Sequence, residues 1–299
     1  MASILVTGGT GLIGSNLCNL LKSKGHSVSI LSRSKTKKSN TFQWNIDKNY
    51  IDKDAITNAD YIIHLAGAGI ADKRWTNARK KVLIDSRVKS TNLLFQKVKE
   101  LNPNLKGFIS ASGIGYYGAI TSEKIFNEND APYNDFLSEI CILWEKEAAK
   151  FNSLNIRTVI FRTGIVISKE GGALEKMIKP IKFGIGAALG TGKQYMPWIA
   201  IEDLCNMYLS AIENIELKGI YNAAITDSTT NIALTKLIAK TLKKPLWLPN
   251  IPAFVLKILL GELAIILLKG SRVSSEKIKK TGFKFKYTSL EKYLIKNIN

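Results

Sequence analysis

Three glycines near the start of the chain have the spacing of a phosphate-binding turn. Gly8, Gly11 and Gly14 stand in the run Thr-Gly-Gly-Thr-Gly-Leu-Ile-Gly, after an apolar segment and at the start of a helical pattern. Gly8 permits a tight turn, Gly11 lets the backbone approach a pyrophosphate, and Gly14 lets the helix pack against the strand. The helix N-terminus adds free N–H groups and the positive end of its dipole. The spacing therefore predicts a dinucleotide-binding turn.

The end of the second predicted strand indicates which dinucleotide binds. A site specific for NAD usually has Asp or Glu there to bind the ribose 2′-OH, but this chain reads Leu-Ser-Arg-Ser-Lys from residue 31. Ser32 can donate a hydrogen bond, and Arg33 with Lys35 can pair with a 2′-phosphate. The residues therefore favour NADP over NAD; the alternative is that Arg33 only points to solvent.

Short β-branched runs alternate with longer amphipathic segments over the first 160 residues or so, as in a parallel sheet covered on both faces. The predicted strands are residues 3–7, 27–32, 61–65, 108–111 and 156–162. The predicted helices between them are residues 12–24, 76–101 and 136–152. We expect an α/β fold, a Rossmann-type doubly wound parallel sheet with a smaller mixed α/β C-terminal substrate lobe.

The pattern loosens after Arg162 into a glycine-rich stretch up to Gly192, where we expect loops. Helical patterns return at residues 201–214, 232–242, 253–268, 274–280 and 290–298. We predict an NADP-binding core over residues 1–165, with returning elements near 194–224. Residues 166–299 would form the substrate lobe, including a small helical domain from about residue 246.

The charge of the chain is strongly positive, +19 at pH 7 over 299 residues. Only seven of the 43 basic residues are arginines, and the lysines are scattered through every predicted element. Nucleic-acid readers usually gather Arg and aromatic residues on one face. We therefore expect a lysine-rich solvated surface, a small-molecule substrate and no nucleic-acid partner; anionic membrane binding is a weaker reading of the same charge.

The cysteines and histidines bear on the expected cellular compartment and on metal binding. The three cysteines form no CxxC pair, which favours a reducing, cytoplasmic compartment, and two histidines argue against a metal site. We expect no signal peptide, because the chain starts directly with a strand pattern. The most apolar stretch, residues 251–268, is interrupted by Pro252, Lys257, Gly261 and Glu262, so we expect a buried or interfacial helix pair there and no stable membrane insertion. A monomer and a homodimer both stay open.

Several motifs together resemble the extended short-chain dehydrogenase/reductases that include sugar-nucleotide epimerases. They are the glycine turn, His64-Leu65-Ala66-Gly67, Ser110-Ala111-Ser112, Tyr116-Tyr117-Gly118 and Trp198-Ile199-Ala200-Ile201-Glu202-Asp203. Further motifs are similar to those of an atypical epimerase-family subgroup with a C-terminal domain of unknown function, in which some members are labelled cell-division inhibitors. They are Ala71-Asp72-Lys73-Arg74-Trp75, Trp144-Glu145, Arg162-Thr163-Gly164, Gly192-Lys193-Gln194-Tyr195 and Gly282-Phe283-Lys284-Phe285.

The resemblance implies roles for individual positions around bound NADP(H). The pyrophosphate would be held by Gly8, Gly11, Leu12, Ile13 and Gly14, and the adenosine phosphate by Ser32 and Arg33. The cofactor would be lined by His64, Leu65, Ala66 and Gly67 and reached by Lys81 and Ser86. For Lys81, a solvated helix face is an equal alternative.

The proton chemistry of the wider family depends on a Tyr with a Lys four residues later on one helix face, where the ammonium stabilises the phenolate. None of the ten tyrosines here has Lys at that position. In the helix where the pair is expected, Cys141 and Glu145 have this spacing, and a carboxylate beside a thiol raises the thiol pKa. The sequence therefore does not predict the usual Tyr-based dehydrogenase chemistry.

Three residues are the alternative catalytic candidates. Ser112 would orient a substrate carbonyl, Tyr117 or its neighbour Tyr116 would supply a phenol, and Glu145 would act as a base if buried. Each also has a structural reading: a strand-end turn, a packing aromatic and an ion-pair partner. Cys141 ranks below them as a small core residue.

The substrate pocket has six candidate residues. Arg74 and Arg162 would bind an anionic group, and Tyr195 and Trp198, with Lys193 and Gln194, would shape the pocket. The alternative is a structured loop under the C-terminal lobe. The sequence thus predicts an NADP-dependent oxidoreductase or epimerase acting on a small polar, possibly nucleotide-sugar, substrate. A non-catalytic NADP(H)-binding, redox-sensing protein is the alternative, because the Tyr/Lys pair is missing.

Overall fold

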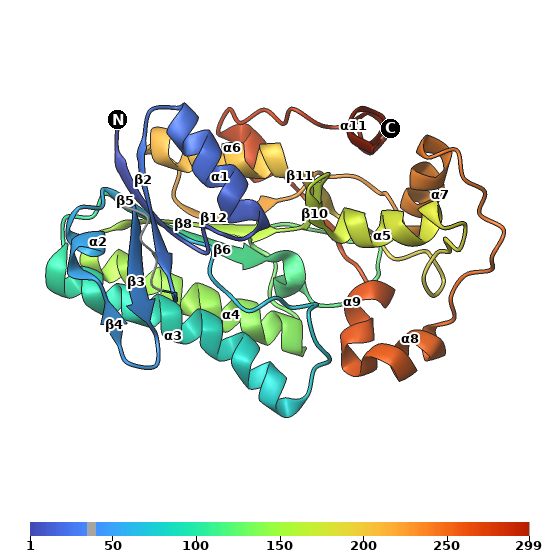
Figure 1. Ribbon diagram of the computed structural model, residues 1–299, viewed down its shortest axis with the longest axis horizontal. Helices are drawn as coiled ribbons and strands as arrows, with labels where there is room; N and C mark the ends of the chain where they lie inside the picture. Colours follow the sequence, from blue (N-terminus) through green and yellow to red (C-terminus); the bar gives the residue numbers. More distant parts are fainter. Residues whose placement is uncertain (35–39, 299) are drawn as a thin grey trace.

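A computed structural model describes residues 1–34 and 40–298 of the chain. Its centre is an eight-stranded sheet in the order β12-β8-β6-β5-β1-β2-β3-β4, in which only β4 runs antiparallel to its neighbour (Figure 1). In chain order the strands are β1 Ser3–Thr7, β2 Ser27–Ser32, β3 Thr41–Asn45, β4 Tyr50–Ile51, β5 Tyr61–His64, β6 Gly107–Gly113, β8 Arg157–Thr163 and β12 Gly219–Ala223.

The chain winds outward from β1 in both directions, first through β2 and β3, then through β5, β6, β8 and β12. The order reverses between β1 and β5, so the connections leave the sheet on opposite faces there. A crevice opens at such a reversal, at the carboxyl ends of the strands, and it is the usual ligand site of an open parallel sheet. The glycine turn after β1 lies at this point.

Helices cover both faces of the sheet (Figure 1). On one face lie α1 Leu12–Ser23 and α6 Ile201–Glu213, which pack against each other. On the other lie α2 Lys53–Thr57, α3 Asn77–Leu101 and α4 Phe136–Ala149, followed by a short 3-10 segment Lys150–Leu154. An apolar cluster lies between the sheet and each layer of helices, because strands that are buried on both faces carry apolar side chains on both faces.

The second half of the chain adds two small sheets and further helices. A three-stranded sheet has the order β10-β9-β11, and β13 pairs with β7. Its strands are β9 Ile165–Ser168, β10 Gly171–Gly172 and β11 Trp198–Ala200, and the pair is β7 Ile125–Phe126 with β13 Arg272–Val273. The helices are α5 Ala173–Lys182, α7 Asn231–Thr241, α8 Ala253–Leu260, α9 Ile265–Leu268, α10 Glu276–Lys280 and α11 Leu290–Ile298.

The expected fold class is confirmed, and the ends of the first two strands agree with the prediction. One local prediction was wrong. The glycine-rich stretch after Arg162 is not mostly loop, because it contains β9, β10 and the ten-residue α5. The apolar stretch 251–268 forms a pair of helices, as expected: Gly261, whose φ is +63°, interrupts the helical pattern between α8 and α9.

Two further features concern membrane-spanning helices and the state of the cysteines. Within residues 1–34 and 40–298, no helix combines the length and the apolar character needed to cross a bilayer. Cys18, Cys141 and Cys205 are free and buried. Burial raises the pKa of the Cys18 thiol to about 11 and that of Cys205 to about 12.

Candidate functional site

The glycine turn after β1 is tightly packed on one side and open on the other. Gly8 has a φ of +69°, in the left-handed region, and its carbonyl accepts the Gly11 N–H at 3.1 Å. A Cβ on Gly14 would lie 2.6 Å from the Cα of Gly9, so only glycine lets α1 pack this closely on the turn. A Cβ on Gly11 would meet only the Gly8 oxygen, at 3.5 Å. Gly11 is exposed and gives α1 no side-chain cap, which leaves N–H groups of the first turn available to an anion.

A buried hydrogen-bond chain holds the neighbouring strand end in place. The Thr7 hydroxyl accepts the N–H groups of Leu65 and Ala66 at 3.2 and 3.1 Å, so its own hydrogen is left for Nδ1 of His64, at 2.7 Å. Nε2 of His64 then donates to Ser90 at 3.1 Å. These donors and acceptors require a neutral imidazole with the proton on Nε2. His64 is fully buried and, through the Thr7 hydroxyl, holds the turn that begins at residue 65 in place.

Burial, with a smaller contribution from the Arg87 charge, lowers the pKa of His64 from 6.5 to about 3. The unfolded chain therefore binds a proton between pH 6.5 and 3 that the folded chain does not bind. Below pH 6.5 we expect the free energy of unfolding to fall by up to about 1.4 kcal/mol per pH unit because of this group alone.

Urea unfolding at several pH values checks this expectation. His64→Gln should flatten the pH dependence between pH 6.5 and 5, whereas the matched variant of the other histidine, His26→Gln, should retain it. An unchanged slope in His64→Gln would contradict the assignment of a neutral buried imidazole.

At the end of β2, Ser32 is half-buried and accepts the Ser34 N–H at 3.2 Å. Arg33 is exposed and forms no ion pair with a carboxylate of the described residues. Lys35, which we predicted to assist Arg33, lies outside the described residues. A guanidinium beside the glycine turn thus has its donors available for a phosphate.

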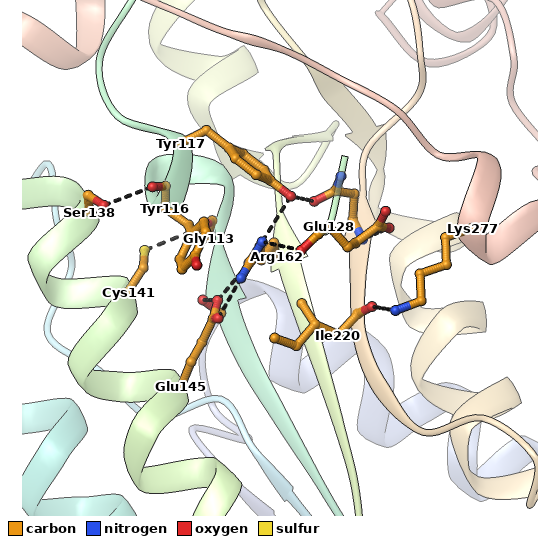
Figure 2. Close-up of polar contacts among 12 residues, drawn as sticks. Gly113, Tyr116, Tyr117, Glu128, Ser138, Cys141, Glu145, Arg162, Ile220 and Lys277 are labelled. Atoms are coloured by element: carbon orange, nitrogen blue, oxygen red, sulfur yellow. Dashed lines mark hydrogen bonds and ion pairs between the residues drawn. The ribbon is translucent and has the colours of Figure 1, made fainter. Parts of the chain in front are cut away.

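The catalytic candidates Ser112 and Glu145 meet in one buried network, in which Figure 2 shows Glu145 beside Arg162. Glu145 on α4 binds Arg162 on β8 through two hydrogen bonds, Nε to Oε1 at 2.9 Å and Nη2 to Oε2 at 2.8 Å. The Ser112 hydroxyl donates to Oε1 of Glu145 at 2.7 Å. The side chains of Glu145 and Arg162 are only 8% and 2% exposed. Both oxygens of the carboxylate are therefore already engaged.

Arg162 extends this network to two tyrosines. Its Nη1 donates to the Tyr117 hydroxyl at 3.0 Å, and that hydroxyl donates to Asn222 on β12 at 2.8 Å. The Tyr116 ring lies against the guanidinium, with its centroid 3.3 Å from Cζ. Tyr117 is fully buried, whereas Tyr116 is half-buried and its phenol has no hydrogen bond to the described residues. Figure 2 shows Arg162 between Glu145 and Tyr117.

Two groups of this region hold their protons tightly. Burial is the main cause that raises the pKa of Tyr117 to about 12, and Arg162 opposes it only in part. Burial, then the nearby Glu145 charge, raises the pKa of Cys141 to about 11, while its thiol lies 3.4 Å from the Gly113 carbonyl. Near neutral pH both stay protonated, which makes them poor bases.

The helix residues predicted to reach the cofactor have different surroundings. Ser86 is half-buried, and its hydroxyl accepts the Ala68 N–H at 3.0 Å, so it supports the turn after β5. The Lys81 side chain is 71% exposed and pairs with Asp85 at 2.8 Å. Arg87 was not predicted: its guanidinium lies 3.0 Å from where a Cβ of Gly67 would be, and 5.0 Å from the Trp144 ring.

The predicted substrate residues are not gathered in one pocket. Arg162 belongs to the buried network. Tyr195 donates its hydroxyl to Glu123 at 2.6 Å, and Trp198 is fully buried in the three-stranded sheet. Arg74 is exposed and lies beside Gly261 of the α8–α9 segment.

The glycine turn, the parallel sheet and the covering helices match a known family. The model of the NAD dependent epimerase/dehydratase family fits residues 4–224, which is more than half of the chain. The chain belongs to this family. A domain of unknown function, DUF1731, matches residues 251–295, the region of α8 to α11.

Members of the epimerase/dehydratase family resemble the chain over nearly its whole length. Epimerase family protein YfhF of Bacillus subtilis is 36% identical over 294 residues, covering 97% of this chain and 95% of that protein. A chloroplastic SDR39U1 homolog of Arabidopsis thaliana is 34% identical, covering 95% of this chain and 83% of its own. The crystal structure of human SDR39U1 isoform 2 with NADPH has a TM-score of 0.89 at 28% identity, covering 99% and 98% of the two chains.

Some residues that shape this site were missed from the sequence. Asn222 stands in an apolar strand, Gly-Ile-Tyr-Asn-Ala, and a polar residue at that place was a usable signal. Thr7 and Ser90 look like ordinary strand-end and helix residues, and no local pattern marks their contact with His64. Strand register places Thr7 opposite His64 across β1 and β5, and the packing of α3 brings Ser90 to the other ring nitrogen.

Proposed function

We propose that this protein is an NADP(H)-dependent oxidoreductase that binds its cofactor at the glycine turn and transfers hydride to or from a small carbonyl or alcohol. The observation that carries the proposal is the turn itself. Gly14 is packed against Gly9, while Gly11 is open and the first N–H groups of α1 are uncapped. This arrangement suits a pyrophosphate and supports binding of a dinucleotide.

The buried network favours a second candidate function, a non-catalytic NADP(H)-responsive protein. Ser112 binds Glu145, Glu145 binds Arg162, and Tyr117 is held between Arg162 and Asn222. While these hydrogen bonds are formed, none of Ser112, Glu145 and Tyr117 is free to exchange a proton with a substrate. Tyr116 is the phenol that catalysis would use, since it makes no hydrogen bond to the described residues.

Three measurements separate the two proposed functions. Calorimetry with NADPH tests cofactor binding. The absorbance of NADPH, followed over a panel of aldehydes, ketones and alcohols, tests turnover, and partner capture by apo and NADPH-loaded protein tests a response to the cofactor. Tight NADPH binding with turnover supports the oxidoreductase. Tight binding without turnover on the whole panel, with partners captured differently by apo and loaded protein, supports the responsive protein. No heat with NADPH or NADH would refute both.

Preference for NADP over NAD is expected to depend on Arg33. Arg33→Glu should weaken NADPH binding by about 100-fold, because it replaces a phosphate ligand with a repelling charge, and should change NADH binding little. Calorimetry of both cofactors measures the change. The control is Lys99→Glu, an equal charge reversal at the exposed end of α3, which should alter neither affinity. Equal weakening of NADPH and NADH would contradict a contact with the 2′-phosphate.

A further inference from the structure

A cavity of about 770 Å³ lies between the start of α4 and the segment that runs from α8 to α9. This volume is in the range that holds a small organic ligand. In Figure 1, α8 and α9 lie beside the sheet domain, on the side that carries α3 and α4. None of the predicted substrate residues lines this cavity.

The cavity adjoins the buried network. Leu137, which lines it, packs against Gly115: a Cβ on that glycine would lie 3.3 Å from the Leu137 Cβ. One helical turn further along α4, Cys141 contacts Gly113, next to Ser112. Thr121, on the segment after Tyr117, also lines the cavity. The cavity thus lies next to residues that pack against the end of β6, the strand that carries Ser112.

The walls are mainly apolar. Trp75, Phe136, Leu137, Ile265 and Leu268 supply ring and alkyl surface. The indole N–H of Trp75 is already bound to the Ile70 carbonyl at 2.9 Å, so this residue offers only its ring. Burying alkyl groups against such walls stabilises a complex in proportion to area, whereas the hydroxyls of a sugar would lose hydrogen bonds to water there.

The charges at the cavity that lack a partner are positive. Lys257 and Lys269 are exposed, and neither forms an ion pair with a described carboxylate. Of the two acids at the cavity, Glu262 pairs with Lys80, and Asp135 accepts the N–H groups of Ala119 and Ser138. An anionic group is therefore favoured over a cationic one at this opening.

We propose that this cavity binds an amphipathic anion, an alkyl or aromatic body with one carboxylate-like end, and that the carbonyl or alcohol substrate of the site belongs to this class. That the ligand is a substrate rests on the proposed oxidoreductase function. That the cavity binds the ligand does not. The apolar body lies against Trp75, Phe136 and Leu268, and the anionic end lies toward Lys257 and Lys269. The proposal replaces the polar nucleotide sugar expected from the sequence.

Calorimetry with decanoate, decanol and UDP-glucose tests the proposal on the full chain. Decanoate should bind measurably, more tightly than decanol, and UDP-glucose should bind more weakly than decanoate. Thr191→Trp, at an exposed lining position, places a large side chain in the cavity and should weaken decanoate binding by about ten-fold or more. Tighter binding of UDP-glucose than of decanoate would overturn the proposal.

A charge variant and its control complete the test. Lys257→Glu with Lys269→Glu should weaken decanoate binding by about five-fold or more and decanol binding little. The control, Lys99→Glu with Lys182→Glu, makes the same charge change outside the cavity and should have no effect. Decanoate binding that survives both Thr191→Trp and the Lys257/Lys269 variant would overturn the proposal.

NADPH affinity, measured on the same samples, separates the two hypotheses. Intact NADPH binding without decanoate binding refutes the cavity ligand alone. Absent NADPH binding refutes the proposed function, whatever decanoate does.

Discussion

Glu145→Gln is expected to lower the free energy of unfolding by about 3–5 kcal/mol, because it leaves the buried Arg162 guanidinium without a compensating charge. The two side chains are almost entirely removed from water. The amide oxygen of the variant, Tyr117 and the Glu128 carbonyl, the last two at 3.0 and 3.4 Å, would remain as hydrogen-bond acceptors for the guanidinium, but none of them carries a charge. Water cannot replace the lost carboxylate without opening the contact between α4 and β8.

Urea unfolding of the variant and of Glu139→Gln measures this effect. Glu139 lies on the same helix but is exposed, so its substitution should change stability little. The double variant Glu145→Leu with Arg162→Met should recover much of the loss, because it removes both charges together. A loss below about 1 kcal/mol in Glu145→Gln would show that the ion pair is not buried in solution.

Gly14→Ala is expected to weaken NADPH binding by about 100-fold and to destabilise the protein by about 1–3 kcal/mol. The new Cβ would collide with the Gly8 carbonyl and lie 2.6 Å from the Gly9 Cα, both backbone atoms that cannot move aside cheaply. The start of α1 would be displaced, and with it the N–H groups that face the pyrophosphate.

Gly11→Ala separates packing from ligand approach in the same turn. A Cβ there meets only the Gly8 oxygen at an ordinary distance of 3.5 Å, so stability should change by less than about 1 kcal/mol. Affinity for NADPH should nevertheless fall by about ten-fold or more, because the methyl group lies on the open side of the turn. Calorimetry and urea unfolding of both variants test this; unaltered NADPH binding in Gly11→Ala would contradict the placement of the pyrophosphate.

The first strand and its helix could be predicted because their signals are local. The apolar run of β1 and the glycine spacing each lie within eight residues and carry both the fold and the cofactor hypothesis. The short strands of the second half could not be predicted, since β10 has only two residues and β11 three. Such segments are strands only because a neighbour supplies their hydrogen bonds.

The buried network is beyond local prediction for a different reason. Strand register aligns Ser112, Arg162 and Asn222 across β6, β8 and β12, although they are up to 110 positions apart in the chain. The sequence indicated Ser112 and Arg162 separately, one for a carbonyl and one for an anion. Their contact through Glu145 follows from the packing of α4 on the sheet, which no spacing rule encodes.

The buried cysteines also determine how the folded protein meets electrophiles. Cys18 lies in α1, Cys141 in α4 and Cys205 in α6, so they sample both layers of helices. A thiol that is buried and protonated reacts slowly with an alkylating reagent, which needs access and the thiolate. The rate at which each cysteine is alkylated therefore reports how often its own helix moves away from the sheet, and no label has to be engineered into the chain.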